Sequence, residues 1–164
     1  MSGLQVVLPP GIPGPWADAV KGILYVKKIP FIRVRHDRAD YAPLIRWTAH
    51  SSAPVMVYND ERPRSVWSDQ LFLAERLQAN PALVPSDLED RVLMFGLSNE
   101  LCDENGFGWS RRLMLIHTAA TDPNATEEAR TGMLVFGSKY GYSPAAAAQT
   151  RKTAAREEAR RLRV

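Results

Sequence analysis

The chain has 164 residues, of which 45% are hydrophobic, so it can bury a core in one domain or in two small ones. It lacks a run of about 18 apolar residues and a basic start followed by a long apolar stretch, which argues against a membrane span and a secretory signal. The net charge of +3 arises in residues 151–164, which carry +4, so the rest of the chain carries −1 and the basic balance does not indicate a nucleic-acid partner.

The first half of the chain alternates predicted strands and helices. Residues 4–8 form an apolar strand, and a helix of about twelve residues follows, with Pro15 suited to its first position. Pro30 ends this helix, and residues 31–35 alternate between apolar and polar side chains as a strand does. Residues 40–50 can form a short helix or a loop.

Residues 51–77 continue the pattern with an extended Ala53-Pro54 step, two strands and a helix. The strands are predicted at residues 55–58 and 64–67, around an acidic turn, and Ser68 can cap the helix. The resulting order, βαβ followed by ββα, predicts a thioredoxin-like domain with a mixed four-stranded sheet. We place this α/β domain at residues 1–80.

The second half is predicted to be helical. Residues 81–85 are interpreted as a linker, and Ser86 and Glu89 form a capping-box pattern for a helix that reaches about residue 104. A second helix is expected at residues 109–119, after glycines that interrupt the first. The sequence therefore predicts an all-α domain over residues 86–164.

The end of the chain differs from the other predicted helices. A third helix, capped by Asn124 or Thr126, ends near Gly141, and a further helix begins at Ser143. Between residues 145 and 161 no apolar side chain is larger than alanine, so this helix has almost no face to bury. We expect residues 145–164 to form an exposed basic helix or tail.

Ala53-Pro54-Val55, the hairpin and the helix that ends in Glu75-Arg76-Leu77 resemble the N-terminal domain of bacterial-type glutathione S-transferases (GSTs). That family usually has a Val-Pro step, two strands, a Glu-Ser or Asp-Ser pair and a helix ending in Tyr-Leu. Asp69 and Gln70 stand at the positions of the pair, and Arg76 stands where tyrosine is common. The resemblance extends over residues 4–142. It implies that apolar helices of the family's C-terminal domain are missing here, so we expect a truncated or frame-shifted end.

The resemblance implies a glutathione site in the first domain. The residue before a proline is held extended, so the Ala53 backbone can pair with the cysteinyl part of the peptide. Asp69 is expected to bind the γ-glutamyl ammonium, and Gln70 with nearby N–H groups its carboxylate. The expected geometry is a cis Ala53–Pro54 bond facing the start of the next helix. A plain helix cap with favourable first-turn charge is the alternative for Asp69 and Gln70.

The catalytic position is where the sequence departs from the family. GSTs lower the pKa of the glutathione thiol with a Ser or Tyr hydroxyl, or use a Cys, near the start of the first helix. Gly14 occupies that position here and has no side chain. The helix N-terminus and the Trp16 indole N–H remain, and Ser51 or Ser52 could substitute.

Two functions therefore stay open. The first is a GST-like transferase that conjugates glutathione to an unknown electrophile. The alternative is a non-catalytic binding or scaffold protein of the same fold. No metal is expected, because the three histidines are scattered and a second cysteine is lacking. By resemblance a homodimer is plausible.

Other conspicuous residues are interpreted as structural. Trp47 is expected in the core rather than in a pocket, and Cys102 as a buried, inert thiol on an apolar helix face. Arg111 and Arg112 are expected on a solvated helix face rather than in a cleft that holds the electrophile. A single cysteine excludes an internal disulfide framework and fits a reducing compartment, so we expect the protein in the cytoplasm.

Overall fold

The computed structural model describes residues 3–9, 14–37, 40–104, 106–138, 140–145 and 147. Its chain divides into two compact units, Met1–Cys102 and Asp103–Val164. The predicted basic helix over residues 145–164 lies outside the described residues, apart from Ala145 and Ala147. The domain limits and the linker inferred from the sequence stay predictions.

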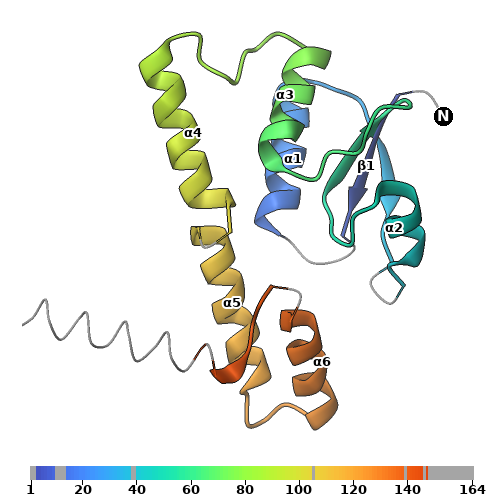
Figure 1. The fold of residues 1–164 in the computed structure, drawn as a ribbon, viewed down its shortest axis with the longest axis vertical. Coiled ribbons are helices and arrows are strands. Elements are labelled where there is room, and N and C mark those ends of the chain that lie inside the picture. The colour runs from blue at the N-terminus through green and yellow to red at the C-terminus, as the bar shows by residue number, and fades with distance from the viewer. Residues whose placement is uncertain are drawn as a thin grey trace, which may run out of the picture. The chain divides into compact units, whose positions relative to one another are not determined.

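The first unit contains three strands and four helices among its described residues (Figure 1). In chain order they are β1 Leu4–Leu8, α1 Pro15–Val26, β2 Ile32–Arg35, α2 Ala42–Thr48, β3 Val55–Tyr58, α3 Trp67–Leu77 and α4 Leu88–Cys102. The predicted βαβ order is confirmed, and the ambiguous segment around residue 45 is a helix.

The predicted fourth strand, at residues 64–67, is wrong. Arg64 forms only an isolated bridge with Met56, with N–H to O=C distances of 2.9 Å in both directions. Pro63 has no N–H to donate on one side of this bridge, and α3 begins at Trp67 on the other. The sheet over the described residues therefore has three strands, in the order β2-β1-β3.

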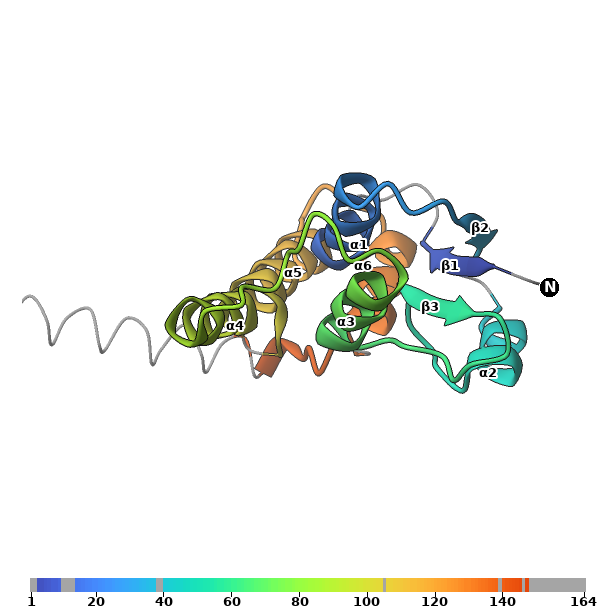
Figure 2. The ribbon, with the colours of Figure 1, turned by 90° about the horizontal axis from the view of Figure 1, so that it is seen from above.

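The sheet is mixed and has helices on both faces. β1 pairs in parallel with β2 and antiparallel with β3. Successive side chains of a strand point to opposite faces, so Leu4, Val6 and Leu8 pack against α1 and α3, whereas Val7 packs with Leu44 of α2. Figure 2 shows α1 and α3 together on one side of the strands and α2 on the other.

A buried lysine joins α1 to the segment that follows α3. Lys27, directly after α1, has no exposed side-chain surface, and its Nζ lies 2.9 Å from Glu75 Oε1. The same ammonium donates to the carbonyls of Gln78, at 2.7 Å, and Pro81, at 2.9 Å. Glu75 Oε1 also accepts from the Leu83 N–H at 2.7 Å. The three N–H groups of the Lys27 ammonium therefore meet three acceptors, and the lysine side chain itself has no contact with solvent.

Helix α4 is held by a few contacts and buries none of its residues completely. Phe95 packs against Trp67 and Phe72, with ring centroids 5.8 and 5.7 Å away. The capping-box prediction at Ser86 is wrong, because the Asp90 N–H bonds Asp87 Oδ1 at 3.0 Å and the helix begins at Leu88. Asp87 is the residue closer to the first helical turn and supplies the acceptor.

The prediction of a buried Cys102 on this helix is also wrong. Leu97, one turn earlier, is 58% exposed, and Cys102 itself is only half-buried. Apolar residues occur on several sides of α4, so no single face can be assigned to a core from the sequence.

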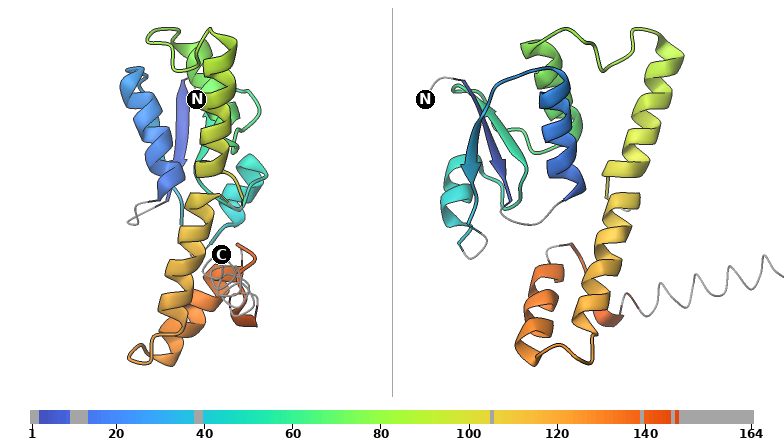
Figure 3. Two further views of the ribbon diagram at one scale, coloured as in Figure 1. Left: turned by 90° about the vertical axis from the view of Figure 1, so that its left-hand side faces the viewer. Right: turned by 180° about the vertical axis from the view of Figure 1, so that it is seen from behind.

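The second unit contains the helix pair α5 Phe107–Ala120 and α6 Glu127–Ser138, which run in opposite directions (Figure 3). Of the two predicted caps for α6, Thr126 is the observed one, because its Oγ1 accepts from the Ala129 N–H at 3.2 Å. After α6, Gly141 adopts a φ of +70°, which returns the chain toward α5. Tyr142 then packs with Ile116 and Ala120.

Close packing at Gly137 leads to a stability prediction for this unit. A Cβ at Gly137 would lie 2.8 Å from Ile116 Cγ2 and 2.9 Å from Tyr142 Cδ1, whereas one at Gly132 of the same helix meets nothing within 4 Å. We expect Gly137→Ala to be less stable than Gly132→Ala by about 1–3 kcal/mol, because both gain helix propensity but only the first overpacks a core. Urea unfolding measures the difference. Equal stability of the two variants would contradict the observed packing.

Candidate functional site

The two halves of the predicted glutathione site meet at Gln70. This side chain is only 2% exposed, and its Nε2 donates to the carbonyls of Pro54, at 3.1 Å, and Arg64, at 3.0 Å. The Ala53–Pro54 bond is cis, as predicted. The extended step before β3 is therefore bonded directly to the first turn of α3.

Ala53 lies just outside the sheet. Hydrogen bonding between β1 and β3 begins at the Val7–Val55 pair. The Ala53 side chain packs beside the small core cluster that contains Leu44, which places its backbone at the end of the sheet. An extended backbone in this position can form strand-like hydrogen bonds with a peptide.

Asp69 stands in the first turn of α3 with an exposed partner. The helix begins at Trp67 with Val66 as its N-cap and no side-chain cap bond. The predicted cap, Ser68, is thus inside the helix, because the first helical bond runs from the Gln70 N–H to the Val66 carbonyl, at 3.1 Å. Asp69 Oδ2 lies 3.2 Å from Arg62 Nη2, with side chains 38% and 73% exposed.

A second charge cluster fastens the turn before α3. Glu61 Oε2 lies 2.6 Å from both Arg64 Nη2 and Arg76 Nη2. The hydrogen bonds from Arg76, and then from Arg64, hold the pKa of Glu61 below its ordinary value, and Glu61 in turn raises the pKa of Arg76. The Arg76 guanidinium also lies over the Tyr58 ring, 5.8 Å from its centroid. Arg76, at the usual tyrosine position, therefore connects α3 to the turn and to β3.

The start of α1 has the geometry expected from the sequence but no side-chain donor. Gly14 is the N-cap, with an extended backbone, and Pro15 is the first helical residue. The Trp16 indole N–H donates to the Cys102 carbonyl at 2.7 Å, so this N–H already has an acceptor within the protein. Ser51 and Ser52 are exposed.

Other predicted candidates lie elsewhere. Trp47 is 41% exposed, so the prediction that it belongs to the core is wrong. Among the described residues no group of three or more His, Cys, Asp or Glu side chains could hold a metal ion. Arg112 lies over the Tyr140 ring in the second unit, 5.7 Å from its centroid.

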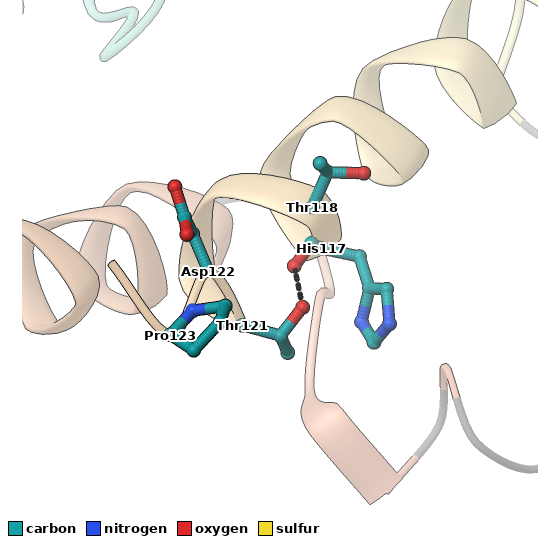
Figure 4. Close-up of a pocket in the computed structure, with 5 residues that line it drawn as sticks. All are labelled: His117, Thr118, Thr121, Asp122 and Pro123. Carbon is teal, nitrogen blue, oxygen red and sulfur yellow. Dashed lines mark hydrogen bonds between the residues drawn. The ribbon is translucent and has the colours of Figure 1, made fainter. Parts of the chain in front are cut away.

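A shallow hollow at the end of α5 belongs to the second unit and contains none of the predicted site residues. Its lining consists of His117, Thr118, Thr121, Asp122 and Pro123 (Figure 4). The polar groups are largely used within the helix end: Thr121 Oγ1 donates to the His117 carbonyl at 2.7 Å, and Asp122 Oδ1 accepts from the Asn124 N–H at 2.8 Å. The arrangement caps the helix and turns the chain.

Comparison with known proteins supports the fold. No protein-family model matches the sequence, and neither does any curated protein at a significant level. Among solved structures, a tau-class GST from mango, Mangifera indica, superposes with a TM-score of 0.57 at 19% identity, covering 80% of this chain and 56% of that one. A GST homologue from Sulfitobacter with bound glutathione has a TM-score of 0.57 at 16% identity, covering 91% of this chain and 68% of that one.

The chain has the glutathione transferase fold. A GST from Methylobacterium radiotolerans in complex with glutathione sulfonate gives a TM-score of 0.55 at 20% identity, with 79% of this chain and 59% of that one covered. The chain thus spans between 56% and 68% of the length of these three structures. The predicted fold class, a thioredoxin-like unit followed by helices, is confirmed except for the fourth strand. Within the described ranges no helix could cross a membrane.

The structure adds residues that the sequence did not indicate. Arg62 and Glu61 carry the ion pairs around the predicted site, yet in the sequence they form part of an ordinary charged turn. The two acids followed by two arginines between β3 and α3 were the available signal, but their pairing depends on how the turn folds back on α3.

Proposed function

We propose that this protein binds glutathione in its first unit, at the junction of the Ala53–Pro54 step and α3. The observation that carries the proposal is the bond from Gln70 Nε2 to the Pro54 carbonyl, which joins the two predicted halves of the site. The fold, shared with GST structures that hold glutathione or its sulfonate, supports the same assignment.

The proposed roles follow from the contacts. The Ala53 backbone pairs with the cysteinyl part, and Asp69 binds the γ-glutamyl ammonium. The N–H groups of the first turn of α3 favour the γ-glutamyl carboxylate. Because Gln70 Nε2 already has two carbonyl partners, we assign Gln70 to positioning the site in place of direct carboxylate binding.

Thiolate activation is expected to be weak. A free thiol titrates at about pH 8.5, so an enzyme must supply donors that favour the thiolate. Gly14 supplies none, and the Trp16 N–H bonds the Cys102 carbonyl. These observations favour glutathione binding with slow conjugation to an unidentified electrophile, or a binding role without catalysis.

Calorimetric titration with glutathione tests the binding site. We expect Asp69→Asn to weaken glutathione binding at least about tenfold, because the variant loses a charge-assisted hydrogen bond to the ammonium. Asp60→Asn is the matched control, since Asp60 is an exposed acid in the preceding turn. Absence of heat from millimolar glutathione with the unmodified protein would refute the proposed function.

A gain of function tests the catalytic position. In Gly14→Ser, we expect bound glutathione to show increased thiolate absorbance at neutral pH, because a hydroxyl at the N-cap of α1 can donate to the sulfur. Alanine at the same position adds a methyl group without a donor and serves as the control. Equal thiolate absorbance in both variants would show that the start of α1 does not face the thiol.

The exposed apolar side chains of α4 suggest how the protein associates with itself. Large apolar side chains of α4 are exposed in the single chain, and pairing of two chains would cover such a surface: Leu88, Val92, Leu93, Leu97 and Leu101. We therefore propose a homodimer, and we place it in the cytoplasm because the chain has a single cysteine. Sedimentation velocity checks it, and a monomer at micromolar concentration would contradict it.

A further inference from the structure

The γ-glutamyl end of glutathione carries an ammonium and a carboxylate, two groups of opposite charge, on the same carbon atom. The proposed function gives the ammonium a partner in Asp69 but gives the carboxylate only backbone N–H groups. Gln70, the side chain expected from the sequence to help the carboxylate, has its Nε2 committed to the Pro54 and Arg64 carbonyls. A guanidinium close to these N–H groups would add a charged partner for the carboxylate.

Two of the three arginines around this turn are committed elsewhere. Arg64 bonds Glu61 at 2.6 Å, and its side chain is only 14% exposed. Arg76 reaches both carboxylate oxygens of Glu61 at 2.6 Å. Both guanidinium groups therefore hold the turn against α3 through hydrogen bonds to one shared carboxylate, that of Glu61.

Arg62 differs from both. Its side chain is 73% exposed, and the single contact that its guanidinium makes within the described part of the chain is with Asp69, at 3.2 Å. A guanidinium has five N–H donors, so one contact leaves most of its donors available. Exposed ion pairs of this kind are weak and rearrange at little cost.

We propose that Arg62 binds the α-carboxylate of the γ-glutamyl group, and that the Arg62–Asp69 pair selects ligands with a free ammonium and a free carboxylate on the same carbon. This inference rests on the proposed function. Asp69 uses one oxygen for Arg62 and offers the other to the ligand ammonium. The ligand carboxylate then lies beside the guanidinium, so that each charge has neighbours of opposite sign.

Two glutathione analogues separate the contributions of the pair. In γ-aminobutyryl-cysteinylglycine the α-carboxylate is missing, and in glutaryl-cysteinylglycine the ammonium is missing. We expect Arg62→Gln to weaken glutathione binding about tenfold in calorimetry and to leave the affinity for the analogue without the carboxylate unchanged. Conversely, Asp69→Asn weakens glutathione binding and leaves the affinity for the analogue without the ammonium unchanged.

The control is Arg33→Gln, which removes an exposed arginine of β2. If Arg62→Gln binds glutathione as the unmodified protein does, or loses the same factor for the analogue without the carboxylate, the role of Arg62 is refuted while glutathione binding stands. If the unmodified protein binds none of the three peptides, the proposed function and the inference are both refuted.

Discussion

Replacing Lys27 with methionine is expected to lower the free energy of unfolding by about 3–5 kcal/mol, the largest effect of a single substitution that we predict. Methionine has nearly the same length but no charge, so Glu75 loses its counter-ion, and the carbonyls of Gln78 and Pro81 lose their ammonium donor. Lys27 has no exposed side-chain surface and Glu75 only 20%, so water cannot replace the lost partners fully. Urea unfolding followed by circular dichroism measures the loss.

The neighbouring Lys28 provides a matched control, because it is exposed and has the same side chain. Lys28→Met is expected to change the free energy of unfolding by less than about 0.5 kcal/mol, as surface substitutions usually do. If both variants lose the same stability, the buried position of Lys27 is wrong.

The Lys27–Glu75 ion pair also predicts how the stability of the protein changes at acidic pH. Burial acts to raise the pKa of Glu75, but the Leu83 N–H and the Lys27 ammonium outweigh it and hold the pKa below its ordinary value of 4.5. A lowered folded-state pKa stabilises the protein above pH 4.5, and this contribution is lost as the pH falls through the folded-state value. The stability difference between the unmodified protein and Lys27→Met should therefore narrow below pH 4.5. A constant difference would exclude Glu75 as the partner.

Local signals in the sequence were sufficient for most of the first unit. Pro15 after Gly14 placed the start of α1, and the short apolar run of residues 4–8 predicted the strand β1. The cis Ala53–Pro54 bond was also predicted, from the resemblance of the surrounding residues to a known family. These features depend on neighbours within a few residues.

The features that the sequence did not predict depend on distant parts of the chain. No local pattern marks Lys27 as buried, because it precedes another lysine, yet a segment about 50 residues later closes over it. Residues 64–67 follow an acidic turn, where the second strand of a hairpin is expected, but α3 begins before a ladder can form. No local pattern indicates the two partners of Gln70 Nε2, which are carbonyls from two earlier segments.

Gln70→Leu is expected to have the second largest effect, because it removes the link between the two halves of the proposed site. The Pro54 carbonyl loses its donor in a buried position, whereas the Arg64 carbonyl keeps the Met56 N–H at 2.9 Å. An orphaned buried acceptor costs about 1–3 kcal/mol. Glutathione affinity should fall as well, by about tenfold, because the Ala53 backbone is no longer held against Asp69. Unfolding in urea and calorimetric titration measure the two effects separately.

Two companion variants distinguish a positioning role from a general loss of stability. Gln78→Leu makes the same chemical change at an exposed position just after α3 and should leave both measurements unchanged. Gln70→Glu keeps the length of the side chain but, when ionised, offers no donor to the two carbonyls. We expect burial beside two carbonyls to raise the folded-state pKa of this glutamate, so stability should rise as the pH falls and the protonated carboxyl donates again. If glutathione affinity in Gln70→Glu does not recover together with stability, Gln70 supports the fold but does not position the site.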